Sequence, residues 1–107
     1  MVLSMFIFST VAYSQKYISD LSKFDKKRPV RNKTLYIVLH TTEAPSESSL
    51  NSVKRGGTCN YLVTSDGVIH IIISDIKVAK HAGRSMWNGR SNLSDISVGI
   101  EVAGWHN

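Results

Sequence analysis

The sequence predicts a single α/β domain, and three features of its 107 residues support this. Residues 34–40 form an almost unbroken apolar run, typical of a strand covered on both faces. Apolar runs at 59–64 and 68–73 flank an Asp-Gly turn, which is a strong signal for a β-hairpin. Residues 97–102 form a fourth apolar run, so strands make up most of the predicted core.

Helical signals are fewer than strand signals in this chain. Apolar side chains recur at helical spacing over residues 17–24 and predict a short helix there. Ser46 predicts the amino-terminal cap of a second helix that runs to about Arg55, and the glycine pair that follows predicts its end. Residues 81–95 are rich in Gly, Ser and Asn, and they predict a long functional loop.

The amino terminus has the character of a leader. Residues 1–12 are apolar and uncharged, but they are too few for a spanning helix, which needs about 20. They suit the apolar core of a secretory signal peptide, with a small-x-small cleavage site at 12–14. A buried first strand or helix is the alternative. We therefore expect a signal peptide at 1–14, a secreted, periplasmic or cell-envelope protein, and no transmembrane span in the mature chain.

Charge and cysteine content narrow the class of protein. The formal charge is +5, and most of the excess lies in a basic segment at 15–33. Such a segment is usually a solvated face or linker, or it is attracted to an anionic cell wall or membrane surface. A nucleic-acid partner is not expected, because no aromatic platform or recognition-helix pattern accompanies the charges. Cys59 is the only cysteine, which excludes an intrachain disulfide and a CxxC zinc pair.

His40 and Glu101 are the leading candidates for chemistry. His40 ends the apolar run at 34–40, and a neutral imidazole on a rigid strand end suits zinc. A hydrogen-bonded structural histidine is the alternative. Glu101 interrupts the last apolar run, where a carboxylate is costly unless it is paired or lies near a cation or reacting water. It would act as a general base beside a metal-bound water, or else face solvent on an edge strand.

Other candidate residues are less specific. His81 and Trp87 lie in the predicted loop and suit ligand contact, with loop packing as the alternative. His70 lies within the hairpin and is expected to be structural, and His106 has no interpretable context. No G-x-S-x-G nucleophile elbow or glycine-rich phosphate loop is present, and Glu101 lacks a clear second acid for glycoside hydrolysis.

Four segments then occur in one order over residues 34–105: His40-Thr41-Thr42, the hairpin at 60–69, His81-Ala82-Gly83-x-Ser85-x-Trp87, and Asn92 through Ser97-Val98-Gly99-Ile100-Glu101-Val102. In this order they resemble the zinc-dependent N-acetylmuramoyl-L-alanine amidases. This type-2 amidase family shares its fold with peptidoglycan recognition proteins and phage T7-type lysozyme. The resemblance implies a mixed central β-sheet flanked by helices, with residues 34–107 as the amino-terminal portion of a catalytic domain whose C-terminal part is missing.

The resemblance also implies roles for individual residues. His40 matches the first zinc ligand, and Glu101 matches the catalytic glutamate of the branch that includes the bacterial muropeptide-recycling amidase. The other branch carries a catalytic tyrosine where this chain has Cys59, which fits the glutamate branch. The positions that match the substrate cleft are Asn60, His81, Trp87 and Asn92.

The implied function is peptidoglycan hydrolysis. Such an enzyme binds peptidoglycan or muropeptides and cleaves the amide between N-acetylmuramic acid and L-alanine with the help of Zn²⁺. The second zinc histidine and the third ligand of the family, an Asp or Cys, would lie beyond Asn107. We therefore expect a partial amidase sequence, and the alternative is a catalytically incomplete remnant that binds peptidoglycan.

Overall fold

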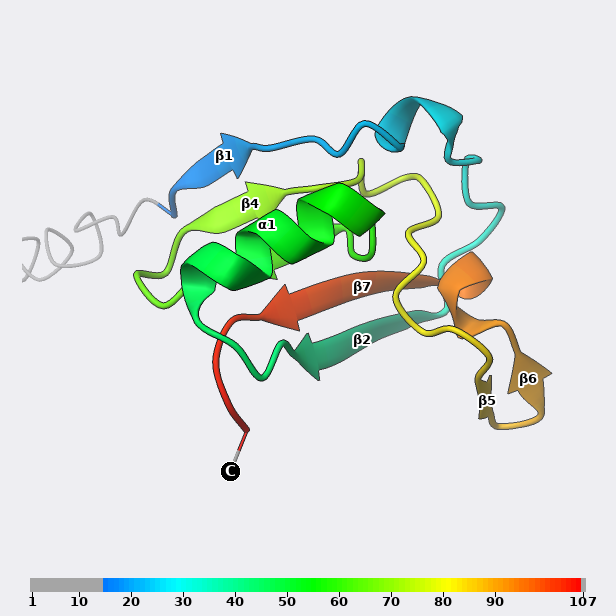
Figure 1. Ribbon diagram of the computed structural model, residues 1–107. Helices are drawn as coiled ribbons and strands as arrows, with labels where there is room; N and C mark the ends of the chain where they lie inside the picture. The colour runs from blue at the N-terminus through cyan, green and yellow to red at the C-terminus, as the bar shows by residue number, and fades with distance from the viewer. Residues whose placement is uncertain (1–14, 107) are drawn as a thin grey trace, which may run out of the picture.

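The computed structural model describes residues 15–106, and its centre is a five-stranded mixed sheet (Figure 1). The predicted signal peptide falls on residues 1–14 and lies outside the described residues. Across the sheet the strands are β1 (Tyr17–Ser19), β4 (Ile69–Ile71), β3 (Tyr61–Val63), β7 (Ser97–Val102) and β2 (Tyr36–Thr41). Helix α1 (Ser46–Gly56) lies across one face of this sheet, which confirms the predicted α/β class.

Strand pairing follows the predicted hairpin. β3 and β4 are antiparallel and are joined by the Asp-Gly turn, where Gly67 has a φ of 81° that a side chain would disfavour. β7 pairs in parallel with both β3 and β2, and β1 pairs in parallel with β4. The carboxyl ends of β2, β3 and β7 therefore meet at one edge of the sheet.

The predicted helix over 17–24 is wrong. The segment instead forms β1, followed by a 3-10 turn, η2 (Asp25–Lys27). β1 hydrogen bonds in register with β4, and Asp20 beyond its end binds His70 at 2.6 Å. These long-range partners outweigh the local helical spacing of the apolar residues.

Helix α1 matches its predicted span but not its predicted cap. Its carboxyl end is closed by Gly57, which has a φ of 60° and donates its N–H to the carbonyl of Val53 at 2.8 Å. Pro45 occupies the cap position at the other end. The Ser46 hydroxyl accepts a hydrogen bond from the backbone N–H of Ser65 instead, so it ties α1 to the hairpin turn.

The core lies between α1 and the sheet. Leu62 of β3 is fully buried and belongs to one apolar cluster with Val53 of α1. Burying a leucine side chain contributes about 1.5–3 kcal/mol. The prediction that residues 34–40 are covered on both faces is wrong for the described chain, because β2 is an edge strand and Ile37 and Leu39 are each 68% exposed.

The predicted loop at 81–95 contains regular structure. It forms a small hairpin of β5 (Met86–Trp87) and β6 (Arg90–Ser91), followed by η3 (Leu93–Ile96). The two turn residues, Asn88 and Gly89, both have positive φ angles, as a type I′ turn requires. None of the helices in residues 15–106 has the length and apolar character needed to cross a membrane.

Candidate active site

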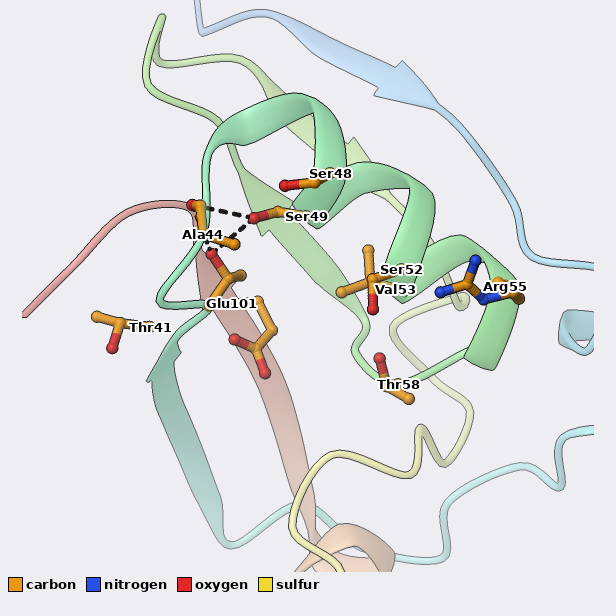
Figure 2. A pocket seen from close by; sticks show the side chains of 10 residues that line it. Thr41, Ala44, Ser48, Ser49, Ser52, Val53, Arg55, Thr58 and Glu101 are labelled. Carbon is orange, nitrogen blue, oxygen red and sulfur yellow. Dashed lines mark hydrogen bonds between the residues drawn. The ribbon is translucent and has the colours of Figure 1, made fainter.

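His40 and Glu101 are direct neighbours on the sheet. Their Cα atoms are partners in the parallel pairing of β2 with β7, and Leu62 is the partner of Glu101 on β3. Because side chains alternate along a strand, all three project from the face that α1 covers. Figure 2 shows the Glu101 side chain directed from β7 into the space beneath α1.

Glu101 is a half-buried acid without a protein partner among the described residues. Its Oε2 atom is shielded from solvent and has no hydrogen-bond donor. Burial raises the pKa of the carboxyl group, and the positive charge that His40 can carry opposes this shift. A carboxylate with a raised pKa is a better proton acceptor than an exposed one, which suits a general base.

A chain of hydrogen bonds orients the His40 ring. His40 Nε2 lies 3.2 Å from His81 Nδ1, and His81 Nε2 lies 2.9 Å from Ser97 Oγ. The Ser97 hydroxyl donates to the carbonyl of Leu93, so its oxygen is free to accept the Nε2–H of His81. Burial lowers the pKa of His81 to about 4, and His40 adds to this shift. His81 is therefore neutral at pH 7, with Nδ1 accepting from His40.

Gly99 makes this arrangement sterically possible. A Cβ atom at position 99 would lie 2.3 Å from Cγ of His81, which is far inside contact distance. The His81 ring therefore packs directly on the backbone of β7, between Ser97 and Glu101. This role of Gly99 could not be predicted from the sequence, because the contact between Gly99 and His81 joins two distant segments.

A cavity of about 450 Å³ opens beside Glu101 (Figure 2). Its wall on α1 is formed by Ser48, Ser52 and Arg55, whose spacing places them on one side of the helix. The Ser49 hydroxyl donates to Thr42 Oγ1 at 2.6 Å and so fixes α1 to the end of β2. Sequence reasoning missed Ser48, Ser52 and Arg55, although their helical spacing was a usable signal.

Asn60 lies beneath the site rather than in the cavity. It is fully buried, its Oδ1 accepts the N–H of Gly99 at 2.9 Å, and its Nδ2 donates to the carbonyls of Ser74 and Lys77. All of its amide groups are thus bound to backbone. This geometry supports a positioning role for Asn60 beneath the Gly99 backbone.

Trp87 and Asn92 lie away from Glu101. Trp87 is exposed on β5 and lines a separate hollow beside β2. Asn92 is exposed at the start of η3, where it has a left-handed backbone conformation with a φ of 54°. Of the residues predicted for the site, the structure brings His40, His81 and Glu101 together.

The other two histidines are bound to acids outside the cavity. His70 lies 2.6 Å from Asp20 and 3.2 Å from the Thr64 hydroxyl, which confirms its expected structural role. Although acid, imidazole and hydroxyl are in series, Thr64 is buried and donates to Asp66 at 2.6 Å, so it is not available as a nucleophile. His106 pairs with Glu43, which lies just beyond the carboxyl end of β2.

The donor atoms suit zinc in kind but not in number. A catalytic zinc site takes three protein ligands, drawn from imidazole, thiolate and carboxylate groups. Within residues 15–106, no group of three such side chains is placed to hold a metal ion. His40 offers an imidazole nitrogen beside Glu101, so the described residues fit part of a zinc site and do not complete one.

The fold and the paired His40 and Glu101 place the chain in the α/β amidase-like class. Specifically, it belongs to the N-acetylmuramoyl-L-alanine amidase family, whose sequence model matches residues 30–107. No curated protein sequence matches the chain.

Two solved structures share the fold. A crystal structure of an Se-Met AmpD derivative superposes with a TM-score of 0.65 at 20% identity, covering 86% of this chain and 63% of that one. The solution structure of Citrobacter freundii AmpD gives a TM-score of 0.56 at 22% identity, covering 84% of this chain and 59% of that one. The chain thus spans about three fifths of the length of these two structures.

Proposed function

We propose that this chain carries the His40 and Glu101 part of a peptidoglycan amidase. The bond cleaved is the amide between the lactyl carbonyl of N-acetylmuramic acid and the amino group of L-alanine. The observation that supports this most strongly is Glu101, a half-buried carboxyl group whose Oε2 has no hydrogen-bond donor, at the edge of an open cavity and next to His40. Family membership supplies the reaction class.

Glu101 would act as the proton carrier of the hydrolysis. In amide hydrolysis the oxygen of water bonds to the carbonyl carbon, and the bond from that carbon to nitrogen breaks. Glu101 would accept the proton that the water loses and return it to the departing nitrogen of L-alanine. Its raised pKa makes the carboxylate a stronger base for the first transfer, and the carboxylic acid that results is still a stronger acid than a protonated amine, so it can pass its proton to the departing nitrogen.

His40 would be one ligand of a zinc ion. When bound, zinc acidifies water and polarises a carbonyl group. Ser97 and His81 would hold the His40 ring in a single orientation, as outer-sphere partners of a metal ligand do. On this proposal the further protein ligands are not among the described residues.

The wall of α1 would bind the substrate. The hydroxyl groups of Ser48 and Ser52 can hydrogen bond to sugar and peptide groups, and Arg55 presents a guanidinium to carboxylates of the stem peptide. His81 contributes indirectly, through His40. The predicted contacts of Trp87 and Asn92 with peptidoglycan remain part of the proposal, for a substrate long enough to reach the β5–β6 hairpin.

The test is digestion of purified peptidoglycan by zinc-loaded protein, followed by detection of stem peptides with a free L-alanine amino terminus. We expect release by a form of the protein that supplies the further zinc ligands, and a loss of at least about 100-fold when Glu101→Gln is introduced into that form. Glu47→Gln is the matched control, because Glu47 is an exposed carboxylate on α1 outside the Glu101 cavity. Undiminished release by Glu101→Gln would refute the role of Glu101.

A second candidate is a peptidoglycan-binding remnant without activity. It is favoured by the lack of a three-donor metal group within residues 15–106. This candidate predicts muropeptide binding in calorimetry, no stem-peptide release, and no zinc by elemental analysis of the purified protein.

We also propose a location in the cell envelope or outside the cell, as the predicted leader at 1–14 and the nature of the substrate suggest. Fractionation of cells expressing the chain with and without residues 1–14 tests this. Retention of both forms in the cytoplasm would contradict it.

A further inference from the structure

Three segments that carry exposed basic side chains, η2, 28–35 and 80–90, lie at one end of the molecule, where β2 and β7 begin (Figure 1). We call this the basic end. The segment 28–35 runs along it and is tied to its neighbours by hydrogen bonds from Arg31 N to Ile76 O and from Leu35 N to Ile96 O, each at 2.7 Å. Its exposed basic side chains come from η2, this segment and the region 80–90: Lys26, Lys27, Lys33, Lys80, Arg84 and Arg90.

Acidic side chains do not balance this charge. Asp25 is buried and paired with Lys77 at 3.5 Å, and the Asp75 carboxylate accepts the hydroxyl of Tyr61 at 2.9 Å. Two exposed acids, Asp75 and Asp95, do lie at this end, but six exposed basic side chains outnumber them. Glu43 and Asp66 lie toward the opposite end, in the segments that follow β2 and β3. The charge is therefore unevenly distributed along the strands, with the excess of positive charge at the basic end.

Large apolar side chains are exposed at the same end. Trp87 and Met86 are 64% and 74% exposed on the β5–β6 hairpin, which projects from the molecule beyond the start of β2 (Figure 1). Val30, within the segment 28–35, and Ile76, which is hydrogen bonded to that segment, are also exposed. Arg84 and Arg90 flank Met86 and Trp87 in sequence and are exposed as well, so the hairpin region presents both apolar and cationic groups to solvent.

We propose that the basic end binds the surface of an anionic phospholipid bilayer. Lysine and arginine near such a surface are attracted to its negative potential, and tryptophan partitions into the headgroup layer because its ring is apolar with one polar N–H. A dissolved polyanion would satisfy the charges but leave Trp87 and Met86 in water. The joint exposure of both kinds of group therefore favours a bilayer over a soluble polymer.

Docking in this way fixes the direction of the active-site cavity. Glu101 lies near the carboxyl end of β7, whereas the basic end contains the start of that strand. A domain held at its basic end would therefore turn the Glu101 cavity away from the lipid. The inference does not depend on the proposed roles of His40 and Glu101, but it competes with the proposed substrate contact of Trp87, because this side chain cannot bind lipid and peptidoglycan at once.

The two tryptophans provide an internal control. Trp105 is 63% exposed, almost as much as Trp87, but it follows the carboxyl end of β7. The full chain is mixed with vesicles of equal parts phosphatidylglycerol and phosphatidylcholine, the latter brominated. In Trp105→Phe we expect Trp87 emission to shift to the blue and to be quenched. In Trp87→Phe we expect Trp105 emission to stay unchanged.

Cosedimentation with the same vesicles tests the charges. Lys26→Gln with Lys27→Gln should weaken binding about 30-fold. The control, Lys16→Gln, removes one charge near the β3–β4 turn, away from the basic end, and should change binding by less than about twofold, against about fivefold for Lys26→Gln alone. Circular dichroism checks that each variant is folded.

Three results would overturn the proposal. The first is no cosedimentation of the unaltered chain, or equal cosedimentation with vesicles of phosphatidylcholine alone. The second is equal weakening in Lys16→Gln and Lys26→Gln. The third is binding without any change in Trp87 emission, which would show adsorption of charge only, as to any polyanion.

Discussion

The two faces of the sheet differ in what covers them, although the same strands build both. On the face beneath α1, Leu62 is fully buried and lies next to Glu101 in register. On the opposite face, Ile37 and Leu39 are each 68% exposed in the described chain. The covered face thus carries His40 and Glu101, and the open face carries mostly apolar side chains.

This difference shows how the site depends on α1. A carboxyl group that is fully exposed to water keeps its ordinary pKa. At Glu101, α1 and the sheet partly exclude water, which disfavours the charged form and raises the pKa. The same exclusion holds His81 neutral. The open face has the more apolar residues, yet the covered face provides the low-dielectric surroundings that chemistry requires.

The largest expected difference between the faces is in stability. Leu62→Ala should lower the free energy of unfolding by about 3 kcal/mol, because it removes buried methyl groups and leaves a cavity. Leu39→Ala, on the open face, should change it by less than about 0.5 kcal/mol. Urea denaturation measures both, and equal losses would mean that the open face is covered in solution.

Gly99→Ala should destabilise the protein by about 2 kcal/mol, since the new methyl group would displace the His81 ring. Combining it with His81→Ala tests this cause. The double variant should lose less than the sum of the two single losses, because the clash disappears with the ring. Strictly additive losses would show that the contact does not exist.

Glu101→Gln should stabilise the metal-free protein by about 1 kcal/mol at pH 7, because it removes a charge that lacks a donor. The raised pKa sets the sign of the pH effect. Glu101 favours folding below its ordinary pKa of 4.5, and this contribution is lost as the pH rises through the folded value. Urea midpoints in a chelator should therefore diverge with rising pH and converge near pH 4.

An effect about as large as that of Glu101, but with the opposite dependence on pH, is expected for Asp20, which binds His70 on the covered side of β4. The hydrogen bond from His70 lowers the pKa of Asp20, and Lys54 adds to this against the effect of burial. Its contribution to stability is therefore present above the ordinary value of 3.8 and is lost as the pH falls through the lowered value. Asp20→Asn should cost about 1 kcal/mol at pH 6, and the deficit should shrink towards pH 2. A deficit that stays constant with pH would contradict the linkage.

Local signals in the sequence predicted the elements whose partners are near in the chain. The Asp-Gly turn predicted the β3–β4 hairpin, and the glycine pair after Arg55 predicted the end of α1. β1 was missed because its strand conformation depends on pairing with β4, some fifty residues later. The Asn88-Gly89 turn carried a usable hairpin signal that was absorbed into the predicted loop.

Three residues of the candidate site could be predicted from the sequence, but their geometry could not. Residue type and the resemblance to the amidases singled out His40, His81 and Glu101, and the structure brings them together. Nothing local to His81 shows that Gly99 leaves room for its ring, or that Ser97 fixes its proton. The positioning role of Asn60 was likewise hidden, because its side-chain hydrogen bonds to two separated segments, at Gly99 and at the turn from Ser74 to Lys77, are visible only in the folded chain.

The pairing of β2 with β7 also sets the order in which the site can form. The β3–β4 hairpin joins residues close in sequence and can close early, whereas His40 waits for Glu101 at the far end of the described chain. Long loop closures are slow because their entropic cost precedes any contact energy. During synthesis His40 would therefore emerge long before Glu101, and the pairing of β2 with β7 would be the last among the described strands to form.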